Sequence, residues 1–286
     1  MDRFLLKHKI AEIKKLPSCP DLLPQVIQLS RLSNASMRDY EKIIRRDPSL
    51  VAQIFKIVNS PFYGMSHQIS NLRVALTILG LTEVYRIVLN TSFYKSLQNS
   101  FDGLSYDFRI FWKHCEMVAN AAQFFAEKFH RRQIGEAYAA GLLHDIGKLV
   151  MEQYFPDEWG EVLLEFTRNE GDFLDIETDV FGFNHAEVGS LLLEQWNIPD
   201  EIVIPVQFHH NPFGAIRNGE LTNIVYFADK TAAALTEDFR DDVTHEGLDK
   251  DKLWYEMIAR YPHFNILDSE RMLASLQEIL NRSIPE

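Results

Sequence analysis

The sequence predicts an all-α protein, and three observations support this fold class. Apolar residues recur at three- and four-residue intervals along nearly all of the 286 residues. No stretch of alternating apolar and polar residues is long enough to indicate a sheet. Helix start signals, in which Ser or Asp precedes Pro or an acidic residue, recur along the chain. A hydrophobic content of 46% is enough for one or two cores without disulfides.

Start signals precede the first helices. Pro24 suits the first turn of a helix, since that position needs no backbone N–H. Ser36 and Asp39 have the spacing of a capping box, which predicts a second helix. Asp47 and Pro48 predict a third, because Asp can accept hydrogen bonds from the unpaired N–H groups of a first turn.

Turn-forming residues separate the helices that follow. Ser60-Pro61 and Gly64 should break the third helix. The segment from Asn59 to Gly64 is expected to be structural, because Asn and Gly both tolerate positive φ. Gly80 should end the next helix.

A polar connection at Gln98–Gly103 predicts two parts, an N-terminal helical subdomain over residues 1–100 and a second over residues 101–286. Asp107 can cap a long helix beyond the connection. The apolar side of that helix comprises Phe111, Cys115, Val118, Ala122, Phe125 and Phe129. Residues 236–251 read as an acidic surface loop before the terminal helices.

The composition predicts a soluble cytoplasmic protein. No run of eighteen apolar residues appears, and the N-terminus lacks the pattern of a signal peptide. Two cysteines, Cys19 and Cys115, form no C-x-x-C pair, which fits a reducing compartment. The net charge of -12 opposes binding to phosphate backbones. Neither a membrane nor a nucleic acid is therefore expected as a partner.

Five histidines and two aspartates occupy contexts typical of metal ligands. They are His114, His144, Asp145, His185, His209, His210 and Asp229. His144 and Asp145 close an apolar helix that we expect Gly147 to break, and adjacent helical side chains point about 100° apart, so both can reach one ion. Imidazole and carboxylate donors without thiolate suit Fe, Mn, Ni or Zn. The sequence therefore predicts one or two divalent transition-metal ions.

Four segments of the first half follow one another in a specific order. They are Leu16-Pro17, Asp47–Leu50, Val58–Gly64 and Ala75–Gly80. In order and spacing they resemble the signature of the HDOD (HD-related output domain) family. The resemblance covers about residues 16–230 as one unit. It implies a bacterial signal-transduction protein that binds signalling proteins or a small phosphorylated ligand.

The order of the metal-ligand candidates is similar to that of the HD phosphohydrolase superfamily, which implies an HD-domain-like helical bundle. The resemblance assigns a core site to His114, His144, Asp145 and Asp229, with Asp145 positioned to bridge. It assigns a second ion to His185, His209 and His210 together with Asp145. Lys148 matches a lysine that the superfamily places near the substrate phosphate, where it would be catalytic.

At two positions the sequence departs from the patterns of particular superfamily members, and each departure argues against one property of those members. Asn211 follows the His209-His210 pair where the HD-GYP cyclic-di-GMP phosphodiesterases have an acid, and the GYP motif is missing, so that activity is not expected. Ile110 stands where trinuclear relatives place a Glu, so a third ion is not expected.

Each candidate also has an ordinary interpretation. His144 and Asp145 could be a hydrogen-bonded pair at a helix end, and His114 a core histidine. His185 could be a first-turn residue, and one of His209 and His210 could face solvent.

The remaining candidates have alternatives of the same kind. Asp229 could be an exposed helix acid, and Lys148 could bond the last carbonyls of its helix. Glu187 is either an acid that orients the ring of a metal-ligating histidine or, as we expect, a solvated surface acid.

Two functional hypotheses follow. The first is a regulatory HDOD protein that acts through protein or ligand binding and carries one or two metal ions. The second is a metal-dependent phosphohydrolase of nucleotides or other phosphoesters, with Lys148 stabilising the phosphate. A metal that is purely structural, or that senses a diatomic gas or redox state, is a third possibility.

Overall fold

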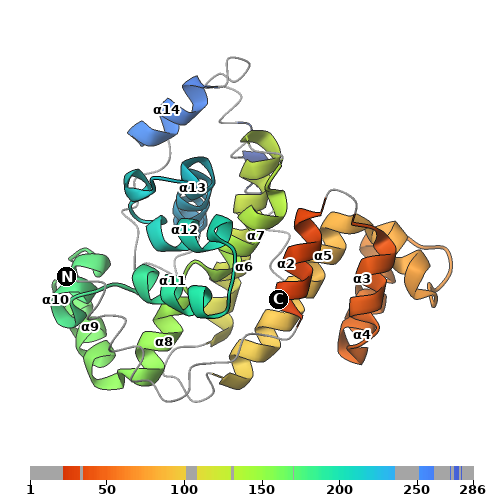
Figure 1. Cartoon of the computed structure of the whole chain (residues 1–286), viewed down its shortest axis with the longest axis horizontal. Coiled ribbons are helices and arrows are strands. Elements are labelled where there is room, and N and C mark those ends of the chain that lie inside the picture. The colour runs from red at the N-terminus through yellow and green to blue at the C-terminus, as the bar shows by residue number, and fades with distance from the viewer. Residues whose placement is uncertain are drawn as a thin grey trace. The chain divides into compact units, whose positions relative to one another are not determined.

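The computed structural model describes residues 22–32, 35–100, 108–129, 132–169, 171–235 and 251–260, together with residues 271, 274–276 and 278. These residues form α-helices and two short 3-10 helices and contain no strand, which confirms the all-α prediction (Figure 1). The described residues divide into two compact units, one formed by residues 22–100 and the other by those from residue 108 onward. No helix in the described part is long and apolar enough to cross a membrane.

The N-terminal unit packs three short helices against one long one. Its elements are α2 (Leu23–Arg31), α3 (Met37–Ile44), α4 (Pro48–Val58), the 3-10 helix η1 (Pro61–Tyr63) and α5 (Leu72–Ser100). α2, α3 and α4 each contact α5. The predicted start signals are confirmed: Asp39 accepts the Ser36 backbone N–H at 3.1 Å, and Asp47 accepts that of Ser49 at 2.8 Å. Pro24 lies in the first turn of α2.

Asn59 holds the segment between α4 and α5 through its side chain. Its amide nitrogen donates to the carbonyls of Phe55 and Ile69, each at 2.9 Å, and its amide oxygen accepts the Ile69 N–H at 2.7 Å. Asn59 itself has φ -91°, so it does not use its tolerance of positive φ. Gly64 does adopt a left-handed conformation, at φ 56°. Gly80, at φ 79°, interrupts α5 and so confirms the predicted helix end.

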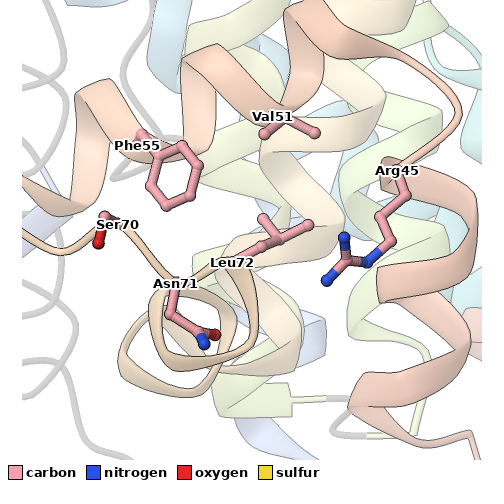
Figure 2. Close-up of a pocket in the computed structure, with 6 residues that line it drawn as sticks. All are labelled: Arg45, Val51, Phe55, Ser70, Asn71 and Leu72. Atoms are coloured by element: carbon pink, nitrogen blue, oxygen red, sulfur yellow. The ribbon is translucent and has the colours of Figure 1, made fainter.

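A cavity of about 340 Å³ opens in the N-terminal unit (Figure 2). Its lining residues are Arg45, Val51, Phe55, Ser70, Asn71 and Leu72. The Arg45 guanidinium donates to the Glu41 carboxylate at 2.7 Å and 3.0 Å. The same carboxylate accepts a hydrogen bond from the Arg73 guanidinium at 2.9 Å, so two cations share one acid.

The second unit is built around one long helix. Its elements are α6 (Phe108–Phe129), α7 (Ile134–Leu143), α8 (Ile146–Tyr154), α9 (Pro156–Asn169), α10 (Phe173–Phe181), α11 (His185–Gln195), α12 (Asp200–Phe208), the 3-10 helix η2 (Pro212–Gly214), α13 (Gly219–Leu235) and α14 (Lys252–Ala259). α7 and α13 pack on α6, α12 packs on α7 and α13, and α11 packs on α8. The predicted apolar side of α6 is buried along its whole length.

The chain turns at His144 and Asp145, between α7 and α8. The prediction that Gly147 breaks the helix is wrong, because α8 begins at Ile146 and runs through Gly147. The glycine is needed for packing. A Cβ atom at position 147 would overlap the carbonyl oxygen of His185 and come within 2.8 Å of the Gly189 nitrogen. The missing side chain therefore lets α8 approach the first turns of α11.

A charged contact joins α14 to α13. Asp251 caps α14 by accepting the Leu253 N–H at 2.9 Å. Its other oxygen accepts hydrogen bonds from the Tyr226 hydroxyl at 2.6 Å and the Lys230 ammonium at 2.7 Å. Trp254 adds an aromatic contact with Phe227, at 5.0 Å between ring centroids.

Several predicted features lie outside the described residues. They are Leu16-Pro17, Cys19, the cap at Asp107, the last three residues of the connection Gln98–Gly103, and residues 236–250 of the expected acidic loop.

Gly147→Ala should lower the free energy of unfolding by roughly 3 kcal/mol, because the added methyl group meets backbone atoms of α11 that cannot rotate away. Gly160→Ala in α9 is the matched control. Its Cβ meets nothing within 4 Å, and Ala in a helix interior should stabilise by up to about 1 kcal/mol relative to Gly. Urea unfolding followed by circular dichroism compares the variants. Equal stability of the two would contradict the close approach.

Candidate metal centre

The seven predicted donors meet in the second unit. They come from the middle of α6 (His114), the turn between α7 and α8 (His144 and Asp145), the start of α11 (His185), the residues after α12 (His209 and His210) and α13 (Asp229). Six of them are buried, and His210 is partly exposed. The interpretation of Asp229 as an exposed helix acid is therefore wrong, since its exposed fraction is 4%.

One cluster, the first metal group, consists of His114, His144 and Asp229. The Nε2 atoms of the two histidines are 3.2 Å apart. Oδ1 of Asp229 lies 3.2 Å from the His114 Nε2 and 3.6 Å from that of His144. Oδ2 of Asp145 also faces this group, at 3.2 Å from the His144 Nε2.

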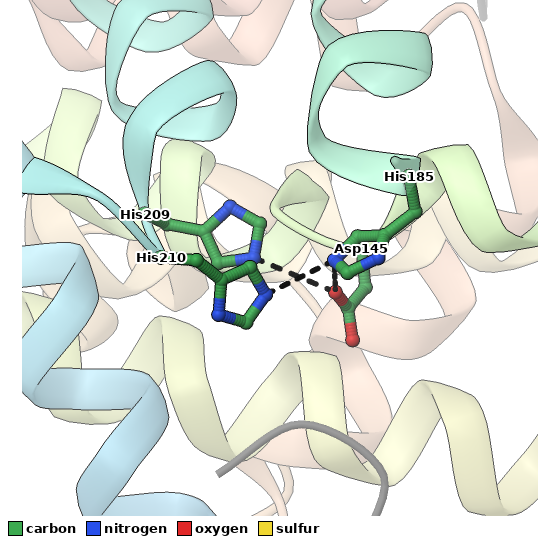
Figure 3. Close-up of side chains that lie close together, drawn as sticks. All are labelled: Asp145, His185, His209 and His210. Atoms are coloured by element: carbon green, nitrogen blue, oxygen red, sulfur yellow. Dashed lines mark hydrogen bonds and ion pairs between the residues drawn. The ribbon is translucent and has the colours of Figure 1, made fainter. Parts of the chain in front are cut away.

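The other cluster, the second metal group, consists of Asp145, His185, His209 and His210. Figure 3 shows the three imidazole rings turned toward the Asp145 carboxylate. Oδ1 of Asp145 lies 3.2 Å from Nε2 of His185 and 3.7 Å from Nε2 of His209. The Nε2 atoms of His185 and His210 are 3.1 Å apart. The two oxygens of Asp145 thus face different groups, the arrangement of a bridging ligand.

Hydrogen bonds at the far side of the rings set their orientation. Nδ1 of His144 lies 2.8 Å from the Gly141 carbonyl, and Nδ1 of His209 lies 2.7 Å from the Val206 carbonyl. A carbonyl can only accept, so each Nδ1 carries the proton and each Nε2 is directed at the centre. This is the tautomer that a metal ion requires of an imidazole.

Buried acceptor atoms show that a cation fits the centre. Asp145 Oδ1 and His209 Nε2 are fully buried and have no hydrogen-bond partner among the described residues. Buried acceptors without partners are rare and costly, and a metal ion satisfies them. The donors are imidazole and carboxylate alone, which fits the predicted choice of Fe, Mn, Ni or Zn.

The charged groups around the centre also favour binding of a cation. Burial would raise the pKa of Asp145, but the charges of His144 and Lys148 outweigh it and hold that pKa well below its usual value. Burial opposes protonation of His144, yet the neighbouring carboxylates of Asp145 and Asp229 raise its pKa to about 10. Burial lowers the pKa of His209 to about 3. In the metal-free chain the His144 proton thus supplies charge that a bound ion would replace.

Lys148 points into the centre. Its ammonium lies 3.0 Å from Asp145 Oδ2 and 5.6 Å from the centre of the Phe173 ring, and the residue is 3% exposed. The interpretation that Lys148 only bonds the last carbonyls of its helix does not describe this contact. The cation is placed to neutralise Asp145.

An acidic residue that the sequence analysis missed contacts His185. Glu177, fully buried on α10, accepts a hydrogen bond from His185 Nδ1 at 2.8 Å. Glu187, which was considered for such a role, instead accepts the Asn184 N–H at 3.2 Å in a capping box at the start of α11. A signal for Glu177 was present, because it lies on the apolar side of α10 with the buried Phe173 and Phe181.

Comparisons with known proteins identify relatives of the chain. The sequence profile of the HDOD domain matches residues 16–212, more than half of the chain. An uncharacterized protein of Treponema pallidum (strain Nichols) is 26% identical over 228 residues, covering 77% of this chain. The chain spans only 42% of the length of that relative.

Solved structures share the fold. An HDOD domain protein of unknown function from Geobacter sulfurreducens superposes with a TM-score of 0.82 at 21% identity, over 98% of this chain and 95% of that one. A candidate signal transduction protein from Marinobacter aquaeolei VT8 gives 0.71 at 25% identity, over 93% and 57%. A candidate phosphohydrolase from Shewanella amazonensis SB2B gives 0.68 at 20% identity, over 96% and 93%. The profile match confirms the resemblance to the HDOD family drawn from the sequence motifs, and the solved structures share the fold.

Removing one donor from either group should cost that group its ion and spare the other. His114→Ala should weaken metal binding at the first group, and His185→Ala at the second, each by more than about 100-fold, since loss of an outer contact alone costs 10- to 100-fold. Where both groups hold an ion, elemental analysis of dialysed protein would then give two ions for the unaltered chain and one for each variant. His67→Ala, at an exposed position, is the control. Two retained ions in both variants would contradict the assigned groups.

Proposed function

The chain belongs to the HDOD domain family, and on this premise we propose that it is a regulatory protein of signal transduction that acts by binding a protein or small-ligand partner and holds one or two divalent transition-metal ions. The main support for this proposal is the burial of the metal centre. Lys148, the cation that a phosphohydrolase would direct at substrate phosphate, is buried against Asp145. A metal ion bound in such buried surroundings is better suited to stabilising the fold or transmitting a signal than to catalysis, which requires substrate to enter and leave.

The N-terminal unit offers a surface suited to binding. The side chain of Asn59 holds the segment that carries η1 by hydrogen bonding to Ile69. In this segment the Phe62 side chain is 84% exposed. Met65 and Val74, in the same unit, are 39% and 45% exposed. Exposed aromatic and aliphatic side chains on a rigid segment are typical of protein interaction sites. The Marinobacter aquaeolei protein that shares the fold is described as a candidate signal transduction protein, which supports the proposed regulatory role.

A second candidate function is metal-dependent hydrolysis of phosphoesters, and the complete set of seven donors favours it. A pair of such ions, when bound, supplies activation of water and neutralisation of phosphate charge. Asp145 would join the two groups, and Lys148 would keep its carboxylate ionised through their 3.0 Å contact. His210 is the one partly exposed donor, so a substrate would approach from its side.

A hydrolysis screen decides between the two functions. The purified protein is first analysed for metal and then assayed on nucleotides, cyclic nucleotides and generic phosphoesters, beside His144→Ala. We expect bound transition metal and no hydrolysis that depends on His144, because Lys148 and six of the seven donors are buried. Turnover that disappears in His144→Ala would replace the regulatory proposal with the phosphohydrolase. If no metal binds after reconstitution with Fe, Mn, Ni and Zn, both accounts of the centre are wrong.

A further inference from the structure

Glu177 is a buried acid that lies outside both metal groups. A single carboxylate oxygen, Oε2, accepts two hydrogen bonds from the same residue, one from His185 Nδ1 at 2.8 Å and one from the His185 backbone nitrogen at 3.0 Å. The other oxygen, Oε1, is fully buried and has no hydrogen-bond partner within the described part of the chain. Burying a carboxyl oxygen without a partner is costly, so its contacts with His185 call for an explanation.

The position of His185 at a helix start explains why an acid is needed. His144 and His209 follow the last residues of α7 and α12, where carbonyl groups of the final turn are unpaired and can accept the Nδ1–H. His185 is the first residue of α11, where the unpaired backbone groups are N–H donors. The unpaired backbone groups of that turn therefore cannot accept a hydrogen bond from the ring Nδ1–H. The acceptor must come from another element, and α10 provides Glu177.

The charges of the two metal groups are unequal without Glu177. Asp229 serves the first group alone, and Asp145 faces both groups. The second group otherwise consists of three imidazoles, which are neutral when they bind a metal. Glu177 adds a negative charge one imidazole ring away from the second ion. With it, each group has one carboxylate of its own in addition to Asp145.

We propose that Glu177 is a positioning residue for the second metal group: it fixes the Nδ1–H form of His185 and supplies the negative charge that the three imidazoles lack. The inference rests on the metal centre proposed above. The hydrogen bond makes the His185 Nε2 a stronger donor to an ion, because the carboxylate draws the Nδ1 proton toward itself. Glu177 would act through His185 and would not itself be a ligand.

Two variants separate charge from hydrogen bonding. Glu177→Gln keeps an oxygen that can accept both N–H groups but removes the charge, and Glu177→Leu removes the acceptor at similar volume. Zn²⁺ is titrated into the chelator-treated 286-residue chain by calorimetry. We expect the affinity for the second ion to fall about 10-fold in Glu177→Gln and about 100-fold in Glu177→Leu, with the first ion unaffected. Visible absorption of the Co²⁺-loaded protein should change for the second ion alone.

Glu187→Gln is the matched control, since Glu187 caps the same helix without contacting a metal donor. It should lower the melting temperature and leave both Zn²⁺ affinities unchanged. The inference is overturned if both Glu177 variants bind the second Zn²⁺ as tightly as the unaltered chain, or if they lose both ions equally. If Glu177→Leu does not fold, Glu177→Gln decides alone. A wild-type chain that binds neither Zn²⁺ nor Fe, Mn or Ni would instead disprove the metal centre itself.

Discussion

Asp145 is an ionised carboxylate with an exposed fraction of 0%, and the second unit is organised around it. Its two oxygens lie between 3.0 and 3.7 Å from five side chains, those of His114, His144, Lys148, His185 and His209. A carboxylate can remain charged in such a place only when cations or hydrogen-bond donors surround it. Lys148 on α8 and the protonated His144 bring positive charge, while α6, α11 and the residues after α12 bring imidazole nitrogens that face the same carboxylate. The packing of these helices therefore has to satisfy one buried charge as well as an apolar core.

Much of this arrangement could be predicted from the sequence. The helical periodicity, the start signals at Pro24, Ser36 and Asp47, and the seven donors were readable because each depends on local chemistry or on residue type. The fold and the HDOD family were predictable for the same reason, since the motifs lie at fixed spacing along the chain. Asp229 was assigned from its place in the order of donors, although it lies beyond the matched residues 16–212.

The remaining features depend on contacts between elements distant in the sequence. Gly147 looked like a helix break because glycine is a poor helix former, but its role comes from the approach of α11. Glu187 and Glu177 were both acids near His185, and only the packing of α10 shows which one reaches the ring. The direction of Lys148 was equally unpredictable, because a lysine can extend toward solvent or fold back to an acid three residues earlier.

The contact of Gly147 with the backbone of α11 limits how this sequence can diverge. Gly147 follows Asp145 by two residues, and the backbone that it touches belongs to the donor His185. A descendant with a larger residue at position 147 would have to move α11 outward and would carry His185 away from Asp145. Loss of this one glycine in a lineage would thus disrupt the geometry of the second metal group, even where all seven donors persist.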